Sequence, residues 1–594
     1  MNFFELAKYL EKLEKTASRN EMTKILAEVL KEAASGEADK LCYLLLGELV
    51  PAYRGIEFNI AEKMMIRVLA AAYGKSAEEI TRSYKSRGDL GDVAYELAKR
   101  AQSRDSKLRV TGVYDRMLEI AKESGEGSQE RKIKNMAGLL SELDPLSAKY
   151  VTRIPIGNMR LGFSDATLLD ALSVMEKGNK SARSEIERAY NVTADIGLIA
   201  QKIKSGGLAS LEKLEAKPGI PIRPSLAERL KTIGEVIEKA GPVVGVEQKL
   251  DGFRTQIHVW QEDGVKRISL FSRNLEHTTA MFPEIVASAK KLDVKSVILD
   301  GETIGYNPKT GKFLPFQETV QRKRKYDIAE FAKKVPLSTF VFDILYLNDR
   351  SFINLPFRER RKILEKTIER GIGSIHLTEQ KETGDTKLIA TELKKSIDAG
   401  LEGLVAKKLD APYEAGNRGF HWIKLKAASA ALGELRGGAQ KGKTQMLDTI
   451  DCLLMGAYKG RGKRAGFGVG GFLLGVRGED GRYYTISRLG TGFSDEQFRE
   501  ARKRIEKLTS QEMPKDYVAD KEIFPDIWAK PSLVVEILAD EITLSPRHTA
   551  GRKKEGGRGY SLRFPRLVRF RDDKNPEDAT TVQEVEKMYK QQKT

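Results

Sequence analysis

Apolar residues recur at intervals of three and four along the first third of the chain, from Met1 to about Ala216. This spacing places them on one face of an α-helix. One such set is Phe3, Leu6, Leu10 and Leu13. Ser18 and Glu21 have the spacing of a helix-capping pair, which marks a helix start independently of the apolar stripes. The pattern predicts an all-α domain over residues 1–217.

The segment Lys217–Pro224 breaks the helical pattern with three prolines and one glycine in eight residues. Such a composition is typical of an interdomain linker. Strand patterns dominate from there to Lys426, with a helical interlude at Phe357–Arg370. We therefore expect an α+β domain over residues 218–426.

The remainder of the chain is again β-rich, with short strands separated by glycine turns. These strands are expected at Ile450–Ala457, Gly471–Val476 and Tyr483–Leu489. They suit a small barrel, and the OB-fold is the barrel commonly joined to nucleic-acid enzymes. Thr581 and Glu584 have capping spacing and predict a short C-terminal helix, which either latches the barrel to its neighbour or frays. We expect an OB-fold domain over residues 427–594.

Composition narrows the functional class. Lys and Arg number 102 against 84 Asp and Glu, for a net charge of +18 and a pI near 9.4, so a polyanion such as nucleic acid is the favoured partner. The cysteines, Cys42 and Cys452, lie far apart and indicate neither a disulfide framework nor a zinc site. No apolar run approaches the roughly 20 residues of a membrane span. We expect a soluble intracellular protein, cytoplasmic or in the nucleoid, that acts as a monomer.

The octet Glu247–Arg254 is the first candidate for chemistry. β-Branched residues precede it, and apolar and polar residues alternate after it, so two strands flank Asp251 and Gly252. Asp-Gly between strands is a strong hairpin signal, and it predicts a hairpin with Lys249 at a strand end. A lysine attacks as a nucleophile only when its amine is neutral, and desolvation and nearby cations favour that form. By itself, Lys-x-Asp-Gly is most often a solvated turn.

Further strand segments carry acids, aromatics and cations. Phe271–Asn274 holds an arginine, and Leu299–Glu302 and Glu402–Lys407 each hold an acid that can bind a ribose hydroxyl or Mg²⁺. In Thr339–Tyr346, strand alternation predicts one face made of Phe340, Phe342, Ile344 and Tyr346.

The strand Trp422–Lys426 places Trp422, Lys424 and Lys426 on one face and apolar residues on the other. Two lysines that project together from a half-buried strand repel each other unless an anion lies close by. A triphosphate would supply that anion.

Two other regions suit phosphate contacts. Arg82, Lys85 and Arg87 precede the glycine loop Gly88–Gly91, and Arg153 and Arg160 flank Gly157-Asn158-Met159. Glycines let backbone amides approach phosphates, and nearby cations release counterions. The segment Arg547–Lys574 holds ten cations against three acids, a net charge of +7 in 28 residues.

Taken in chain order, six segments from Glu247 to Lys574 resemble the motifs of ATP-dependent DNA ligases, members of the covalent nucleotidyltransferase superfamily. The octet matches the nucleotidyl-transfer motif, and Arg563–Lys574 resembles the last motif, which the OB domain carries. Gly88–Gly91 and Met159–Leu172 resemble the helical domain by which archaeal and eukaryotic replicative ligases hold a duplex through its minor groove.

This resemblance implies that the protein seals nicks in double-stranded DNA through lysyl-AMP and DNA-adenylate intermediates, in replication, repair and recombination. It implies Lys249 as the catalytic nucleophile. It implies ATP and Mg²⁺ as cofactors, with Mn²⁺ as the alternative ion. The implied nucleotide-binding residues are Glu247 at the adenine amino group, Phe342 stacked on the adenine ring, and Arg254, Arg273, Glu302, Arg418, Lys424 and Lys426; the implied metal-binding residues are Glu302 and Glu402.

Several other classes of protein share part of this pattern. RNA ligases and capping guanylyltransferases share Lys-x-Asp-Gly, but the long helical region favours duplex DNA. NAD-dependent ligases usually carry a cysteine zinc cluster that this chain lacks. A non-catalytic nick-binding clamp would have lost Lys249, Glu302 or Glu402. Nucleotide breadth (ATP, ADP or NAD) and the preferred ion stay open.

Two further expectations come from the resemblance. Family members often bind a sliding clamp, but the chain has no clear Gln-x-x-aliphatic-x-x-aromatic-aromatic motif. The OB domain is expected to swing between two positions, which exposed linkers near Pro218 and Ala427 would permit.

Overall fold

The computed structural model describes residues 1–16, 18–101, 107–157, 159–324, 326–369, 371–426, 449–459, 468–490, 493, 495–553 and 557–593. The chain divides into two compact units, residues 1–431 and 432–594. Each unit is described by itself. The predicted linker near Ala427 lies outside the described residues.

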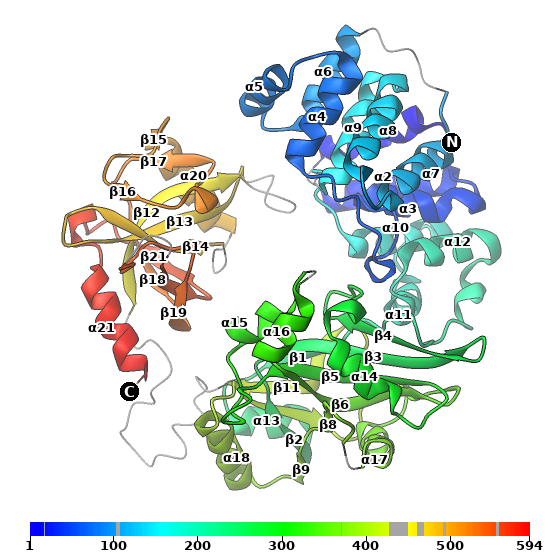
Figure 1. Ribbon diagram of the computed structural model, residues 1–594, viewed down its shortest axis with the longest axis vertical. Coiled ribbons are helices and arrows are strands. Elements are labelled where there is room, and N and C mark those ends of the chain that lie inside the picture. The colour runs from blue at the N-terminus through cyan, green and yellow to red at the C-terminus, as the bar shows by residue number, and fades with distance from the viewer. Residues whose placement is uncertain are drawn as a thin grey trace. The chain divides into compact units, whose positions relative to one another are not determined.

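The first unit begins with a helical region, as the apolar spacing predicts (Figure 1). Phe3, Leu6, Leu10 and Leu13 are each at most 1% exposed in its core, and the Ser18 side chain accepts a hydrogen bond from the backbone N–H of Glu21. The helices are α1 (Phe3–Lys15), α2 (Arg19–Glu32), α3 (Ala38–Leu46), α4 (Glu62–Tyr73), α5 (Ala77–Arg87), α6 (Leu90–Arg100), α7 (Val110–Lys122), α8 (Ser128–Glu142), α9 (Pro145–Ile156), α10 (Asp165–Lys177), α11 (Arg183–Thr193) and α12 (Ile196–Gly206).

Two β-sheets form the centre of the α+β region that follows (Figure 1). The first sheet has the order β1 (Leu226–Arg229), β11 (Arg418–Lys426), β10 (Gly403–Lys408), β2 (Val244–Lys249) and β9 (Gln380–Thr383). The second has the order β4 (Val265–Ser272), β3 (Phe253–Glu262), β5 (Val297–Gly305), β6 (Leu337–Leu347) and β7 (Arg350–Ser351), with β8 (Ile375–Leu377) paired to β6. The helices are α13 (Ile233–Ala240), α14 (Pro283–Lys290), α15 (Phe316–Thr319), α16 (Ile328–Lys334), α17 (Phe357–Thr367) and α18 (Thr386–Asp398).

The predicted hairpin around Asp251 is wrong, although both of its strands exist. β2 pairs with β10 and β9 in the first sheet, whereas β3 pairs with β4 and β5 in the second. The segment between them is therefore a crossing from one sheet to the other. Gly252 is needed there for close packing, because a Cβ atom at this position would lie 2.1 Å from the backbone oxygen of Thr303.

The predicted aromatic face of β6 does not form one packing surface, and Phe340 packs in a separate cluster with Leu250 and Ile304. Phe342 and Tyr346 share a packing cluster, but Ile344 packs with Val341 in a different one. The pairing of β6 with β5 shifts register twice, between Ile298 and Leu299 and again between Asp300 and Gly301. Such an irregularity interrupts the strict alternation of faces on which the prediction depended.

The predicted linker is packed rather than exposed. Pro221 and Ile222 are buried, and the Gln256 side chain both accepts a hydrogen bond from the Ile222 N–H at 3.0 Å and donates one to the Ile222 oxygen at 2.5 Å. The Gly219 N–H donates to Nδ1 of His258 at 3.1 Å. Side chains of β3 thus form hydrogen bonds with the backbone of this proline-rich segment.

The second unit is strand-rich, with a half-barrel sheet, as predicted for residues 427–594 (Figure 1). The main sheet contains β12 (Ile450–Lys459), β13 (Val469–Arg477), β14 (Tyr483–Leu489), β15 (Thr509–Ser510), β16 (Tyr517–Val518), β17 (Ile527–Ala529), β18 (Val534–Leu538) and β21 (Arg566–Phe570). A second pair is β19 (Glu541–Ser545) with β20 (Gly559–Arg563), and the helices are α20 (Asp495–Glu506) and α21 (Val582–Lys593).

The C-terminal helix α21 packs on its own unit. The predicted cap at Thr581 and Glu584 forms, since the Thr581 N–H donates to Oε2 of Glu584 at 2.7 Å. Val585 is fully buried in the core of the second unit, and Gln592 accepts a hydrogen bond from the backbone N–H of Ile542. The described part of α21 is therefore anchored to this unit.

Across the described residues, every helix is too short or too polar to span a lipid bilayer.

Candidate active site

A cavity of about 380 Å³ lies in the first unit, with walls from both sheets. Its volume is in the range of small-molecule sites. Most of the predicted site residues line it: Glu247, Lys249, Arg254, Arg273, Glu302, Phe342, Arg418 and Lys424. The fold thus brings together side chains from five strands and one turn that are far apart in the sequence.

Lys249 ends β2 and lies in a cluster with a carboxylate and a second lysine. Because Gly403 of β10 pairs with Lys249, the preceding Glu402 falls beside the Lys249 side chain, and Oε2 of Glu402 lies 2.7 Å from Lys249 Nζ. The same oxygen lies 3.1 Å from Nζ of Lys426. Gly403 has φ of +140°, and a Cβ atom there would lie 2.1 Å from the Leu425 oxygen. Only glycine allows the strands to approach this closely.

The two predicted metal carboxylates differ in protonation. Burial raises the pKa of Glu302 to about 7, against opposing effects of Lys249 and Arg254. Burial also disfavours the charged form of Glu402, but Lys249, Asp251 and Lys426 outweigh it and lower the pKa of Glu402 to about 2. Glu402 is therefore a permanent anion at neutral pH, whereas Glu302 titrates there. Glu302 lies within β5 and not at a strand end as predicted.

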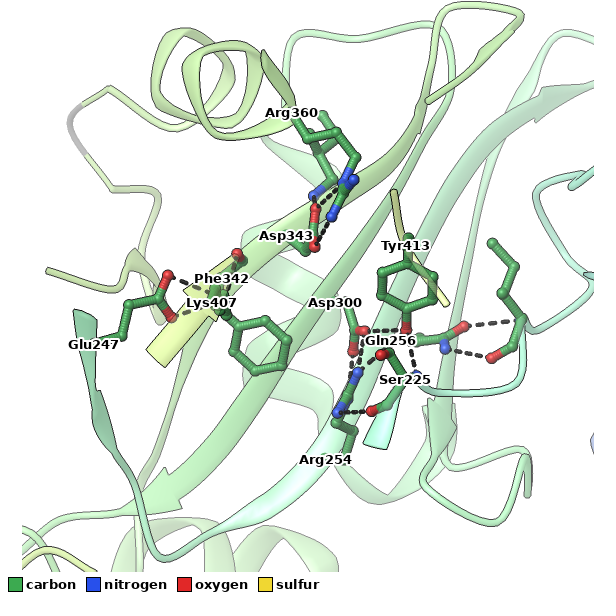
Figure 2. Close-up of polar contacts among 12 residues, drawn as sticks. Ser225, Glu247, Arg254, Gln256, Asp300, Phe342, Asp343, Arg360, Lys407 and Tyr413 are labelled. Atoms are coloured by element: carbon green, nitrogen blue, oxygen red, sulfur yellow. Dashed lines mark hydrogen bonds and ion pairs between the residues drawn. The ribbon is translucent and has the colours of Figure 1, made fainter. Parts of the chain in front are cut away.

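Arg254 is held rigidly on the cavity wall (Figure 2). Its Nε donates to Oδ1 of the fully buried Asp300 at 2.7 Å, its Nη2 also binds Asp300, and its Nη1 donates to the Ser225 oxygen at 3.1 Å. The Tyr413 hydroxyl donates to Asp300 Oδ2 at 2.7 Å. Sequence reasoning assigned no role to Asp300 or Tyr413.

Glu247 lies on the cavity wall, 3% exposed, and is paired with Lys407 (Figure 2). The Phe342 ring lines the same wall and meets Trp422 edge-on, with centroids 5.5 Å apart. Sequence reasoning missed Lys407. A usable signal existed, since strand alternation places Lys407 on the same face of β10 as Val405, and both line the cavity.

Cations without acidic partners cover another part of the wall. Among the described residues, Arg273, Arg418 and Lys424 form no ion pair, and Lys424 Nζ donates only to the Ala227 oxygen at 3.1 Å. Burial and the nearby cations, Arg418 first and Lys249 second, lower the pKa of Lys424. This crowding of positive charge favours an anionic ligand, whereas Lys426, the other lysine of the pair predicted on β11, is already paired with Glu402.

The two glycine loops of the helical region meet, but one of their predicted phosphate contacts is wrong. Arg160 donates to the Gly88 oxygen at 2.5 Å and lies 2.9 Å from Asp89, so it joins the loops. Arg153 is 2% exposed and is surrounded by Asp89, Glu14 and Asp92, so its charge is already neutralised inside the protein. Asn158 lies outside the described residues.

Arg82, Lys85 and Arg87, which the sequence also proposed for phosphate contacts, are exposed on α5.

The last part of the basic stretch, Arg563–Lys574, is neutralised by acids from elsewhere in the second unit. The pairs are Arg563 with Glu541, Arg566 with Asp540, Arg569 with Glu536, and Arg571 and Lys574 with Asp451. Lys554 and Glu555 lie outside the described residues.

Comparisons with known proteins place the chain. The family described as "DNA ligase N terminus" matches residues 2–173, "ATP dependent DNA ligase domain" matches residues 224–426, and "ATP dependent DNA ligase C terminal region" matches residues 465–574. A "Probable DNA ligase" of Dictyoglomus turgidum is 43% identical over 100% of this chain and 98% of its own length. A "DNA ligase" of Acidianus ambivalens is 38% identical over 100% of this chain and 98% of its own.

One solved structure, named "Pmar-Lig_PreS3", resembles this fold with a TM-score of 0.52 at 18% identity, over 95% of this chain and 99% of that one. The family matches cover the helical, central and C-terminal regions in the order seen here, and the relatives align along the full chain. The chain therefore belongs to the ATP-dependent DNA ligase family.

Proposed function

We propose that Lys249 is the nucleophile that becomes covalently adenylylated. Its amine, neutral at the moment of attack, forms the N–P bond to the α-phosphorus of ATP, the bond from that phosphorus to the pyrophosphate oxygen breaks, and the amine loses its proton. The observation that carries this proposal is the convergence in one cavity of Lys249, the cations Lys424 and Arg418, and an aromatic wall. Preorganised cations act where negative charge develops on the transferred group.

The remaining lining residues would orient the nucleotide. The Glu247 carboxylate accepts a hydrogen bond from the adenine amino group, and Phe342 stacks on the base. Glu302, on the neighbouring β5, binds the ribose hydroxyls, and Arg273 lies at the cavity edge where it can reach a phosphate. Arg254 positions the wall through Asp300, because its hydrogen-bond donors are already occupied within the protein.

Glu302 and Glu402 would hold Mg²⁺. Both carboxylates lie beside Lys249, and Mg²⁺ usually takes one or two carboxylates together with substrate phosphates, so this donor set fits. The ion would supply neutralisation of phosphate charge. Glu402 also lies within 2.7 Å of the Lys249 amine, so its charge holds that amine at the cavity until the nucleotide binds.

The later steps act on nicked duplex DNA. The adenylyl group passes from Lys249 to the 5′-phosphate of a nick, the neighbouring 3′-hydroxyl then attacks that phosphate, and AMP leaves. The exposed cations Arg82, Lys85 and Arg87 on α5 would contact the duplex backbone. Replacing all three with alanine should weaken nick sealing and its salt dependence but leave self-adenylylation intact.

The central test uses labelled ATP. The wild-type protein incubated with α-labelled ATP should acquire an acid-labile label on Lys249 and transfer it to nicked DNA. Lys249→Ala should acquire none and should seal only nicks that already carry 5′-adenylate. Lys381→Ala is the matched control, since Lys381 is an exposed strand lysine that pairs with Glu392 away from the cavity. A Lys249→Ala protein that seals unactivated nicks at the wild-type rate would refute the proposal.

A further inference from the structure

Lys407 is a buried lysine on the wall of the cavity. It is 1% exposed, and its Nζ lies 3.0 Å from Oε1 and 2.9 Å from Oε2 of Glu247, whose side chain is 3% exposed (Figure 2). The same Nζ donates to the backbone oxygen of Phe342 at 3.1 Å. One ammonium group therefore connects both residues that are proposed to recognise the base.

Three aromatic rings surround this ammonium. Nζ of Lys407 lies 4.5 Å from the ring centroid of Phe342 and 4.6 Å from those of Trp422 and Phe357. Aromatic faces attract a desolvated cation. The side chain is thus held in place by these contacts, and it is almost completely shielded from solvent.

The charge state of Glu247 depends on its neighbours. Burial raises the pKa of the Glu247 carboxyl, and Lys407 and Arg361 on α17 oppose that rise, whereas Asp343 on β6 adds to it. Arg361 Nη1 lies 3.6 Å from Glu247, farther than Lys407, and Asp343 is itself paired with the buried Arg360. Burial also lowers the pKa of Lys407, and Glu247 is the first neighbour that opposes this fall, so each charge depends on the other across the 2.9–3.0 Å contacts. Removing the Lys407 ammonium would leave burial largely unopposed, and Glu247 would take up a proton.

Protonation would widen what Glu247 can recognise. An ionised carboxylate only accepts hydrogen bonds, which suits the 6-amino group of adenine and disfavours a 6-oxo group. A protonated carboxyl keeps an acceptor oxygen and gains a donor, so it would also bind the 6-oxo group of hypoxanthine or guanine, and the preference for the 6-amino group would fall. A site that must pair a buried polar group rejects ligands that leave it unpaired.

We propose that Lys407 determines the preference of the site for a 6-aminopurine nucleotide, because its ammonium keeps Glu247 an obligate hydrogen-bond acceptor. Lys407 is a positioning residue that acts through Glu247. The inference rests on the proposed function, in which Glu247 meets the purine ring.

The test compares ATP with inosine triphosphate, which carries oxygen where adenine carries the amino group. Rates of self-adenylylation or self-inosinylation are measured for wild type, Lys407→Met and Lys407→Arg. The ATP preference should fall roughly 10- to 100-fold in Lys407→Met, since a hydrogen bond to a charged group has been lost. Lys407→Arg keeps the charge and should retain most of the preference.

Lys381→Met is the matched control. It removes another lysine of the first sheet that pairs with a glutamate, but one that is exposed and away from the cavity. Its preference should equal that of the wild type. A folded Lys407→Met protein with the wild-type ATP preference would overturn the inference about Lys407.

The alternative failures are distinguishable. If Lys407→Met does not fold, as judged by thermal unfolding, Arg361→Gln decides: it should lower the ATP preference by a smaller factor, and an unchanged preference overturns the inference. A wild-type protein that takes no label from ATP on Lys249 would instead refute the proposed function.

Discussion

The nucleotide cavity and the C-terminal basic stretch both concentrate positive charge, but they neutralise it in opposite ways. In the cavity, Arg273, Arg418 and Lys424 have no acidic partner among the described residues. In the second unit, the cations from Arg563 to Lys574 meet carboxylates on neighbouring strands. The C-terminal stretch is the more basic region in the sequence, but these cations are paired with acids, whereas those three of the cavity are not paired in the described part of the chain.

The difference shows that a run of basic residues does not by itself identify an anion site. What matters is whether the fold supplies counter-charges of its own. Among the described residues of the cavity it supplies none for Arg273, Arg418 and Lys424, and the partial burial of Lys424 further disfavours its uncompensated charge, so an incoming triphosphate would be attracted to these cations.

The largest expected effect separates buried from exposed ion pairs. In the first unit, Nε of Arg360 lies 2.8 Å from Oδ1 of Asp343, and both side chains are fully buried. Arg360→Met should destabilise the first unit by about 3–5 kcal/mol, because it leaves a buried charge unpaired. Arg569→Met, whose pair with Glu536 is 61% exposed on the arginine side, should cost less than about 1 kcal/mol. Urea unfolding, followed in each unit by amide exchange, measures both, and equal losses would contradict the comparison.

The next effect concerns catalysis. Lys424→Met removes a cavity cation without an acidic partner, and self-adenylylation should slow roughly 100- to 1,000-fold, as when one preorganised donor to a transition state is lost. Single-turnover labelling with α-labelled ATP measures the rate. Lys381→Met serves again as the surface control. A loss below about tenfold would mean that this cation does not act on the reacting phosphates.

A smaller effect follows from Glu302, whose pKa of about 7 makes its charge depend on pH near neutrality. If its carboxylate binds the metal ion or ribose, self-adenylylation at limiting Mg²⁺ should fall about tenfold per unit as the pH drops below 7 and level off above it. Glu302→Gln should be slower and should lack this dependence. An unchanged pH profile in that variant would assign the ionisation to another group.

The same ionisation affects stability. The folded pKa of Glu302 lies above the ordinary value of 4.5, so the proton bound by the folded state stabilises it below pH 4.5. This contribution is lost as the pH rises from 4.5 to about 7. The unfolding temperature of Glu302→Gln, relative to that of the wild type, should therefore be higher at pH 8 than at pH 4. The reverse order would show that burial does not control this group.

The smallest effect tests the neutralised stretch itself. Asp451→Asn removes the carboxylate that Arg571 and Lys574 share, and although Arg571 keeps its pair with Asp573, affinity for nonspecific duplex DNA should rise several-fold at low salt. The gain should vanish at high salt. Glu479→Gln, at an exposed acid of the same unit, is the control for loss of one negative charge. Equal gains in both variants would indicate net charge rather than release of the pair.

Local pattern was enough to predict the helices and the strands that carry the motifs, since both depend on neighbouring residues. Pairing was not: whether β2 joins β3 or β10 depends on residues far along the chain, and a strong turn signal at Asp251 pointed to the wrong partner. Arg153 and Arg160 look alike in sequence, but Glu14 and Asp92, from two other helices, bury and neutralise only the first.

Most of the candidate site lay within the recognised motifs, and the cavity brings those residues together. The supporting residues were missed because their importance is spatial. Asp300 and Tyr413 are hydrogen-bonded to each other and to Arg254, although they lie far apart in the sequence, and Lys407 matters because it is buried against Glu247. Burial of a charged side chain is decided by tertiary packing, which the one-dimensional pattern does not contain.

Leu250, Asp251 and Gly252 form a three-residue bridge between two layers of the protein, and Gly252 fits against Thr303 with no room for a methyl group. Any larger residue at position 252 would clash with the Thr303 backbone and push the two sheets apart beside Lys249. The position of the Lys249 amine and the width of the cavity therefore both depend on this one glycine.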